Sequence, residues 1–165
     1  MSRVPSTTRR AVAETAVLNN NYLSHKLRDV KGMSAPFAPA RHRLEQVRYS
    51  FEGLYRDTGV HTTDIQRRVA DFGAHYWTSH EPWYVPEPVT LEPTESYSRR
   101  ELDEYAEILK HIAEKAYADP ETVKGAPHAS AIGKVTDHSY FDDPAKWALT
   151  WRGYKERCKG YFEPR

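Results

Sequence analysis

The sequence predicts an α+β fold in which a small antiparallel sheet is covered by helices. Three observations lead to this prediction. A helical pattern fills residues 1–32, the segment around Ser50 alternates as a half-buried strand does, and a capped amphipathic helix follows Ser98. Helices and strands that mix in one short chain pack as layers around a common core. The 165 residues are enough for one such core, so one domain is expected.

Residues 1–32 are expected to form one long helix. Either Thr7 or Thr8 can cap its N-terminus, and Gly32 can end it. Apolar residues recur near the helical spacing along this segment: Val12, Ala16, Leu23, Leu27 and Val30. The stretch GMSAPFAPAR that follows contains prolines that cannot continue a helix, so it is expected to be a connector.

Three segments are expected to be strands. Residues 46–54 alternate between apolar and polar side chains, which predicts a strand with one buried face. Residues 75–80 and 89–92 are shorter candidates. The stretch EPWYVPEP lies between these two, and its prolines predict a loop.

Two capping boxes mark further helices. Thr63 and Gln66 fit the start of a helix over residues 64–72, which Gly73 ends. Ser98 and Glu101 fit the start of a longer helix, whose apolar face would carry Leu102, Tyr105, Leu109, Ile112 and Ala116.

A short helix is expected to follow the longer one. Asp119 and Pro120 can begin it, because proline is tolerated at the first helical position, and Gly125 can end it.

Composition excludes several classes of function. The formal net charge of +1 gives no overall field that would attract nucleic acid or an anionic membrane, and no apolar run is long enough to span a bilayer. No dense set of metal-ligand residues and no nucleotide-binding glycine motif is present, so neither a metal nor a nucleotide site is expected. The one cysteine, Cys158, cannot form a disulfide within the chain, and the expected location is the cytoplasm.

Four motifs occur in a characteristic order along the chain. They are AVLNNNYLSHKL in the first helix, TDI and GAH at the two ends of the second, LEPTES after the strand candidate at 89–92, and GAPH just after Lys124. Together they make the chain resemble the carboxyl-terminal domain of glycine dehydrogenase (decarboxylating), the pyridoxal-phosphate P-protein of the glycine cleavage system, in its subunit 2 form. The resemblance reaches to about Trp151.

The resemblance implies a domain plan. This family belongs to the fold-type I pyridoxal-phosphate enzymes, in which a large domain holds the Schiff-base lysine and a small carboxyl-terminal domain closes over the site. Residues 1–32 would then be the interdomain helix, residues 33–151 the small α+β domain, and residues 152–165 a tail without a counterpart.

The resemblance also implies where the cofactor is bound. No lysine of this chain sits in the setting that the family uses for its cofactor. Pyridoxal phosphate would therefore be bound covalently by a partner, a large subunit with a P-protein-like fold. The chain would be the small subunit of a split enzyme that acts at the α-carbon of glycine or a related amino acid.

Two other functions remain open. The chain can be a non-catalytic module that stabilises or regulates a complete P-protein-like enzyme. It can also be a freestanding enzyme that uses His75 or Cys158, although the sequence offers no recognisable set of nucleophile, base and orienting residue.

The sequence departs from the family pattern at two places. Where the family has a His-Glu pair in its first strand, this chain has Val47-Arg48-Tyr49, and the following proline-threonine-aromatic-proline stretch is replaced by residues 76–82. We therefore expect a similar domain with an altered pocket, which leaves the substrate open.

Four residues are candidates for binding substrate or cofactor: Arg48, Thr78, His80 and Thr94. Arg48 can hold a carboxylate through two hydrogen bonds, or it can be an ordinary exposed arginine of a strand. His80 can contact a phosphate or can lie on the surface without a role.

Three residues are candidates for catalysis: His75, Glu92 and Glu95. His75 follows the GA of a family motif and can transfer a proton. Glu92 and Glu95 flank Pro93 ahead of a capped helix, where they can stand at the mouth of an active site or can serve the turn alone.

Overall fold

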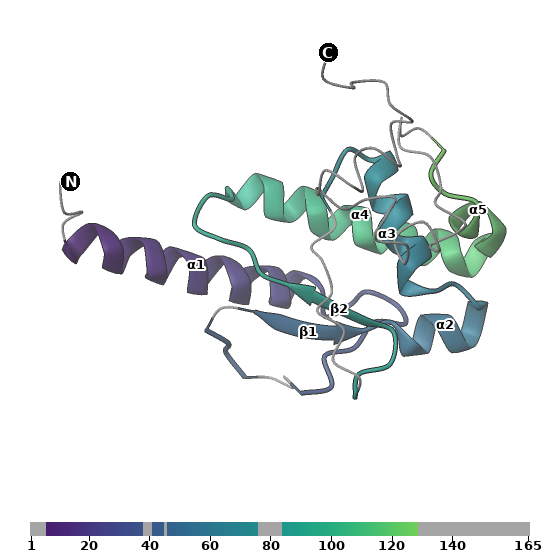
Figure 1. Cartoon of the computed structure of the whole chain (residues 1–165), viewed down its shortest axis with the longest axis horizontal. Coiled ribbons are helices and arrows are strands. Elements are labelled where there is room, and N and C mark those ends of the chain that lie inside the picture. The colour runs from purple at the N-terminus through teal and green to yellow at the C-terminus, as the bar shows by residue number, and fades with distance from the viewer. Residues whose placement is uncertain (1–5, 38–40, 45, 76–83, 129–165) are drawn as a thin grey trace, which may run out of the picture. The chain divides into compact units, whose positions relative to one another are not determined.

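The computed structural model describes residues 6–37, 41–44, 46–75 and 84–128. These residues all lie within the first of two compact units, Met1–Ile132. The helices are α1 (Ser6–Lys26), α2 (Glu52–Thr58), α3 (Thr62–Asp71), α4 (Arg99–Ala118) and α5 (Pro120–Lys124), and the strands are β1 (Val47–Ser50) and β2 (Pro88–Leu91). Figure 1 shows this arrangement, with the two strands beside α1. The predicted α+β class is confirmed.

Strands β1 and β2 form an antiparallel pair. Val47 lies opposite Leu91, and Tyr49 lies opposite Val89. These four side chains are buried on one face of the pair. Since side chains alternate along a strand, Arg48 points to the other face.

The core fills the space between the strand pair and the helices. Its largest fully buried side chains include Leu23 from α1, Leu54 from α2, Ile65 from α3, and Leu102, Leu109 and Ile112 from α4. Each such side chain contributes about 1.5–3 kcal/mol when it leaves water. The apolar face predicted for α4 is therefore confirmed.

Helix α1 is shorter than predicted and only half of it is covered. It ends at Lys26 rather than near Gly32, because the chain turns after it: the Val30 amide donates to the Leu27 carbonyl over 3.2 Å. Thr7 and Thr8 lie inside the helix and do not cap it. Residues 7–15 are all exposed, so the apolar stripe that begins at Val12 reaches the core only in the second half of the helix.

The strand predicted over 46–54 is wrong in its second half. Strand β1 ends at Ser50 and α2 begins at Glu52. Two contacts distant in sequence cause the change: the Phe51 amide donates to the Glu87 carbonyl over 2.9 Å, and the Leu54 amide donates to the Gly32 carbonyl over 3.1 Å. The local alternation of side chains contains no sign of either contact.

Helix α3 begins with different caps than predicted. Its N-cap is His61 rather than Thr63, and Asp64 completes the box in place of Gln66 by accepting the His61 amide over 3.0 Å. The C-terminal end matches the prediction, since Gly73 has a positive φ of 71° just after the helix.

The later elements follow the sequence pattern closely. Ser98 and Glu101 form the predicted box at the start of α4, and Asp119 caps α5, which is followed by Gly125. Strand β2 matches the candidate at 89–92 within one residue. His75 is not in a strand, and the rest of the candidate at 75–80 lies outside the described residues, as does the tail 152–165.

No helix in the described ranges is both long enough and apolar enough to cross a bilayer.

Candidate functional site

Arg48 lies on the open face of the strand pair and is held by one neighbour. Its Nη1 donates to the hydroxyl of Tyr84 over 2.6 Å. Its Nε is buried and has no hydrogen-bond partner, and the hydroxyl of Thr90, directly across the ladder, is also buried and unpaired. Buried donors without partners cost free energy, so this face of the sheet suits a ligand that accepts hydrogen bonds.

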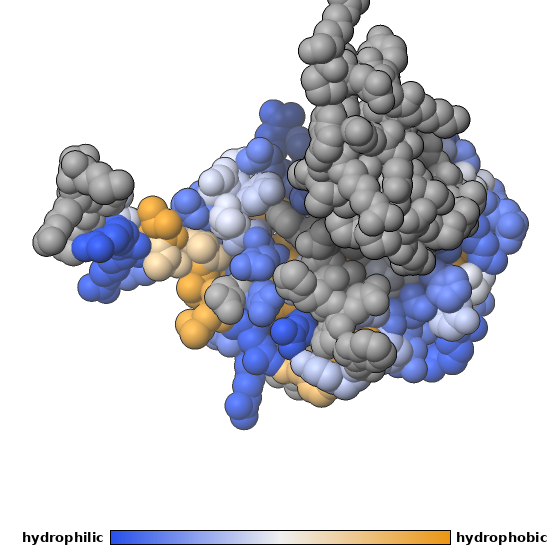
Figure 2. Space-filling model, in the orientation of Figure 1, coloured by the Kyte–Doolittle hydropathy of each residue, from blue (hydrophilic) through white to orange (hydrophobic). Residues whose placement is uncertain are grey.

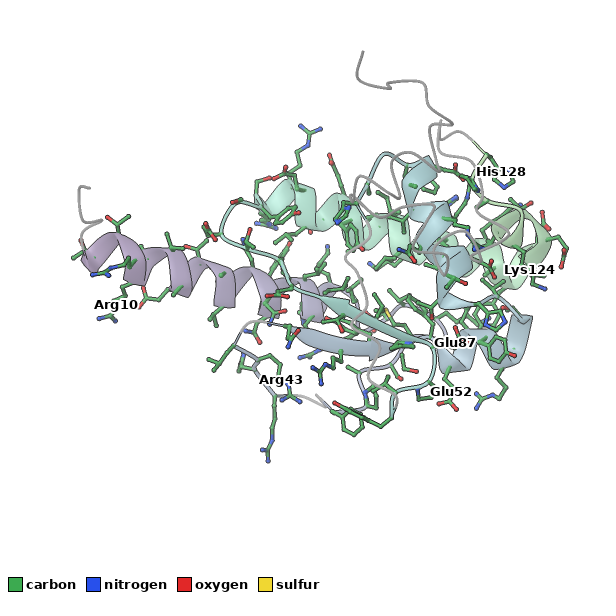
Figure 3. The ribbon with its side chains drawn as sticks, viewed as in Figure 1. Arg10, Arg43, Glu52, Glu87, Lys124 and His128 are labelled. Carbon is green, nitrogen blue, oxygen red and sulfur yellow. The ribbon has the colours of Figure 1, made fainter. Side chains whose placement is uncertain are left out.

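A hollow of about 280 Å³ opens beside Arg48. It is lined by Phe37, Arg43, Gln46, Arg48 and Tyr84. Phe37 meets the Tyr84 ring edge to face, with 5.4 Å between the centroids. Figure 3 shows Arg43 near β1. Among the described residues, the lining therefore brings two guanidinium groups, an amide and a phenol to one space and includes no carboxylate.

Sequence reasoning found Arg48 but missed Arg43, Gln46 and Tyr84. Arg43 lies just after the expected connector, and Tyr84 lies in the stretch EPWYVPEP, where prolines predict only a loop. The one available signal was the strand alternation, which places Gln46 on the same side as Arg48.

His75 lies beside a different hollow. This space, of about 270 Å³, is also lined by Phe72, Tyr97, Glu101 and Tyr105. Glu101 is engaged in the cap of α4, where its carboxylate accepts the Ser98 amide over 2.7 Å. The structure therefore does not bring His75 together with Arg48.

The LEPTES motif forms an exposed turn tied to α1. Asn19 donates its side-chain amide to the carbonyls of Thr94 and Tyr97, over 2.8 and 2.9 Å. The hydroxyl of Thr94 accepts the Ser96 amide over 3.3 Å. Glu92, Thr94 and Glu95 are exposed, and none of them lines the hollow at Arg48 or the hollow at His75. Thr78 and His80 lie outside the described residues.

The GAPH motif ties α5 to α3. The His128 amide donates to Asp71 over 2.6 Å, and the His128 ring contacts the Thr122 carbonyl through Nε2 over 2.7 Å. Figure 3 labels His128 beside this corner of the molecule. The motif thus fixes the packing of α5 against α3.

The family model described as glycine dehydrogenase, C-terminal domain, matches residues 12–128. The chain belongs to this family. Relatives named probable glycine dehydrogenase (decarboxylating) subunit 2 agree with the match. The protein of Pyrococcus horikoshii is 44% identical over 147 residues, which are 89% of this chain. That of Thermotoga maritima is 38% identical over 142 residues, or 86% of this chain. That of Staphylothermus marinus is 37% identical over 155 residues, or 93% of this chain.

The match covers a limited part of each relative. This chain spans 28% of the length of the Pyrococcus and Thermotoga proteins and 30% of the Staphylothermus protein. The sequence-based resemblance to the glycine dehydrogenase C-terminal domain is confirmed.

The glycine dehydrogenase family depends on pyridoxal phosphate, and a covalent site for that cofactor needs a lysine amine that is free to form a Schiff base. Lys26, Lys110, Lys115 and Lys124 form ion pairs with carboxylates, and Lys31 lies over the Tyr117 ring. None of them lines a described hollow. The described residues therefore do not fit a covalent cofactor site.

Proposed function

We propose that this chain completes the active site of a glycine decarboxylase-like enzyme by holding the carboxylate of an amino-acid substrate. The observation that carries the proposal is the hollow at Arg48: a domain of this family presents two arginines to a space whose described lining includes no acid. The substrate is glycine or a related amino acid, and the carboxylate is the group common to all of them.

Arg48 is suited to bind that carboxylate. A guanidinium binds a carboxylate through two parallel hydrogen bonds, which fix its orientation. The bond from Nη1 to Tyr84 holds one side of the Arg48 guanidinium, and Nε remains to donate. Arg43 adds a second positive charge at the same hollow. His75, Glu92, Glu95, Thr78, His80 and Thr94 remain proposed site residues.

The cofactor belongs to a partner in this proposal. The described lysines are engaged elsewhere, so we assign pyridoxal phosphate and its Schiff-base lysine to a large subunit with a P-protein-like fold. The name subunit 2 carried by the relatives supports a two-part enzyme. The single cysteine of the chain suits the cytoplasm.

Helix α1 offers the surface for that partner. Its first half is exposed, and Leu18 is 67% exposed. Figure 2 shows apolar surface, in orange, along this helix. A partner that covers this surface would remove it from water.

The experiment is a substitution in the reconstituted complex. Arg48→Gln and Arg48→Lys are expected to lower kcat/KM for the amino acid by about 10- to 100-fold, because a hydrogen bond to a charged group contributes about 1.5–3 kcal/mol. Most of the loss should appear in KM. Lysine should not restore activity, since it cannot form the paired hydrogen bonds of a guanidinium.

The matched control is Arg56→Gln. Arg56 is exposed on α2 and pairs only with its neighbour Asp57, over 3.5 Å. Its substitution should leave both constants unchanged. Unchanged kcat/KM in both Arg48 variants would refute the assignment of Arg48 to the carboxylate.

A further inference from the structure

We infer that a third hollow, at the C-terminal end of α1, binds a small organic anion that carries two negative charges. This hollow has a volume of about 540 Å³, nearly twice that of the hollow at Arg48. It lies between the last turns of α1 and the residues around Ser34 and His42, with Tyr49 of β1 in its wall. The inference goes beyond the proposed function, because it concerns a different ligand.

The two hollows are separate. They share no lining residue. Arg48 lines one and Tyr49 lines the other, and successive residues of a strand point to opposite faces. A ligand in the larger hollow therefore does not occupy the carboxylate site proposed above.

The larger hollow is basic, and the described residues of its wall include no acid. Arg28 and Arg41 line it together with His25 and His42. A concave wall of one charge sign focuses the electrostatic field and raises the local concentration of ions of the opposite sign.

Its arginines differ from most others in the described part of the chain. Arginines elsewhere form ion pairs: Arg10 with Glu14, Arg56 with Asp57, Arg67 with Asp64, Arg68 with Asp71, Arg99 with Asp103 and Arg100 with Glu104. Among the described residues, no acidic group within 4 Å pairs with Arg28, Arg41, Arg43 or Arg48, and these four line the two hollows. Arg9 is the other unpaired arginine, and it lies near the free end of α1. The unmatched positive charge is thus concentrated at the hollows.

The wall of the larger hollow is fixed by hydrogen bonds. The Asn21 side chain forms two hydrogen bonds with the backbone of Arg43. Its amide nitrogen donates to the Arg43 carbonyl over 2.7 Å, and its oxygen accepts the Arg43 amide over 2.9 Å. This holds the segment that carries Arg41 and His42 against α1. Ser34 and Ser50 exchange two backbone hydrogen bonds, of 2.9 and 2.8 Å, on the other side. A wall fixed before binding loses little entropy when a ligand arrives.

The remaining lining residues define the ligand further. Burial raises the pKa of Tyr49 to about 12, which the hydrogen bond from Ser24 opposes only in part, so its hydroxyl stays neutral. Leu27 and Met33 provide apolar wall for a short carbon skeleton. Two guanidinium groups can bind two negative charges on oxygen atoms. A phosphate monoester and a dicarboxylate both carry two such charges.

The test is a titration of the full 165-residue chain with small anions at constant ionic strength. NMR and calorimetry detect the binding. The probes are inorganic phosphate, glycerol phosphate, succinate and acetate. Saturable binding of the doubly charged probes, with acetate much weaker, is the expected result. Comparison of glycerol phosphate with succinate decides between a phosphate and a dicarboxylate.

Variants locate the binding site. Arg28→Gln and Arg41→Gln are each expected to raise Kd by at least about tenfold, the effect of one lost charged hydrogen bond. The control is Arg9→Gln, which removes an unpaired arginine outside the hollow and should leave Kd unchanged. Thermal unfolding of each variant checks that the fold is retained.

Three results would overturn the inference. The first is the absence of saturation by any doubly charged probe. The second is equal weakening by Arg9→Gln, which would indicate binding to general surface charge. The third is weakening by Arg48→Gln alone, which would place the anion in the other hollow. Because the variants of the two sites differ, failure here leaves the proposed role of Arg48 independently testable.

Discussion

Individual residues of the family motifs act mainly as structural ties in the described part of the chain. In the TDI motif, Asp64 caps α3. In LEPTES, the carbonyl of Thr94 accepts a hydrogen bond from Asn19, and in GAPH the His128 amide donates to Asp71. These contacts explain why the motifs predict the fold well. Arg48 lies outside these motifs, which therefore give no information about the hollow beside it.

Residue-scale prediction succeeded for one capping box and failed for the other. The box of Ser98 and Glu101 spans three residues, and the pattern alone identified it. The box of His61 and Asp64 is equally local, but Thr63 and Gln66 fit the usual pattern better, and a distant residue also supports this end of α3: Glu87 accepts the Thr62 amide over 2.7 Å. A contact across 25 residues leaves no periodic signal in the sequence.

Gly32 is expected to be indispensable for the fold. Its φ is +77°, and a Cβ at this position would lie 2.7 Å from the Leu54 Cβ and 2.8 Å from the Leu54 nitrogen. Gly32→Ala should therefore lower the free energy of unfolding by about 3 kcal/mol or more, from a left-handed backbone together with overpacking. Urea denaturation followed by circular dichroism measures this.

The matched control is Gly73→Ala. Gly73 has nearly the same φ, +71°, but an added Cβ would meet nothing within 4 Å. This substitution should lower the free energy of unfolding only by the backbone strain, about 1–2 kcal/mol. Equal losses for the two variants would show that the close approach to Leu54 is unimportant.

At the scale of elements, the helices that show a clear apolar period were predicted best. The pattern for α4 is complete over its length and was confirmed, whereas α2 is a short helix that was not expected. The predicted strand around Ser50 continued into α2 because Phe51 and Glu52 extend the alternation of β1. Long-range hydrogen bonds, not local propensity, decided where β1 ends.

Glu87 links β2 to the start of α3 and makes that link sensitive to pH. Its carboxylate accepts the Thr62 amide and contacts Nδ1 of His61 over 2.8 Å. Burial favours a higher pKa for Glu87, but the hydrogen bonds from Thr62 and His61 outweigh it and hold the pKa below the ordinary value of 4.5. A carboxylate with a lowered pKa stabilises the fold above its ordinary pKa, and this stabilisation is lost as the pH falls through the lowered pKa.

Glu87→Gln should therefore reduce the stability of the fold mainly at neutral pH. The expected loss is about 1 kcal/mol, the usual contribution of a helix cap. The difference from the natural protein should shrink as the pH falls below 4.5. Thermal melting across this pH range measures the effect, with Glu114→Gln on the exposed side of α4 as the control. A difference that grows in acid would contradict the account.

At the scale of the whole molecule, the exposed half of α1 is the surface that the proposed partner would cover. The sequence predicted a continuous apolar stripe along this helix, but the described core reaches only its second half. Periodicity shows that a helix has an apolar face. It does not show which part of this chain, or which other chain, covers that face.

Leu18→Ser is expected to weaken binding of the large partner without destabilising this chain. Leu18 is 67% exposed, so its removal leaves the described core intact, whereas burial of a leucine in a complex contributes about 1.5–3 kcal/mol. Kd for the partner should rise by about tenfold or more, measured by calorimetry or surface binding.

Leu44→Ser serves as the control, since Leu44 is 79% exposed and does not belong to α1. This variant should bind the partner normally. If it weakens binding as much as Leu18→Ser does, the contact is not specific to α1.

The central claim is that this chain supplies part of an active site that it cannot form alone. The most direct measurement is the release of labelled carbon dioxide from carboxyl-labelled glycine or a related amino acid, by the chain alone, by the large partner alone and by the two mixed. We predict release only from the mixture, in the presence of pyridoxal phosphate. Full activity of the partner alone would favour the non-catalytic module, and release by the isolated chain would contradict the account outright.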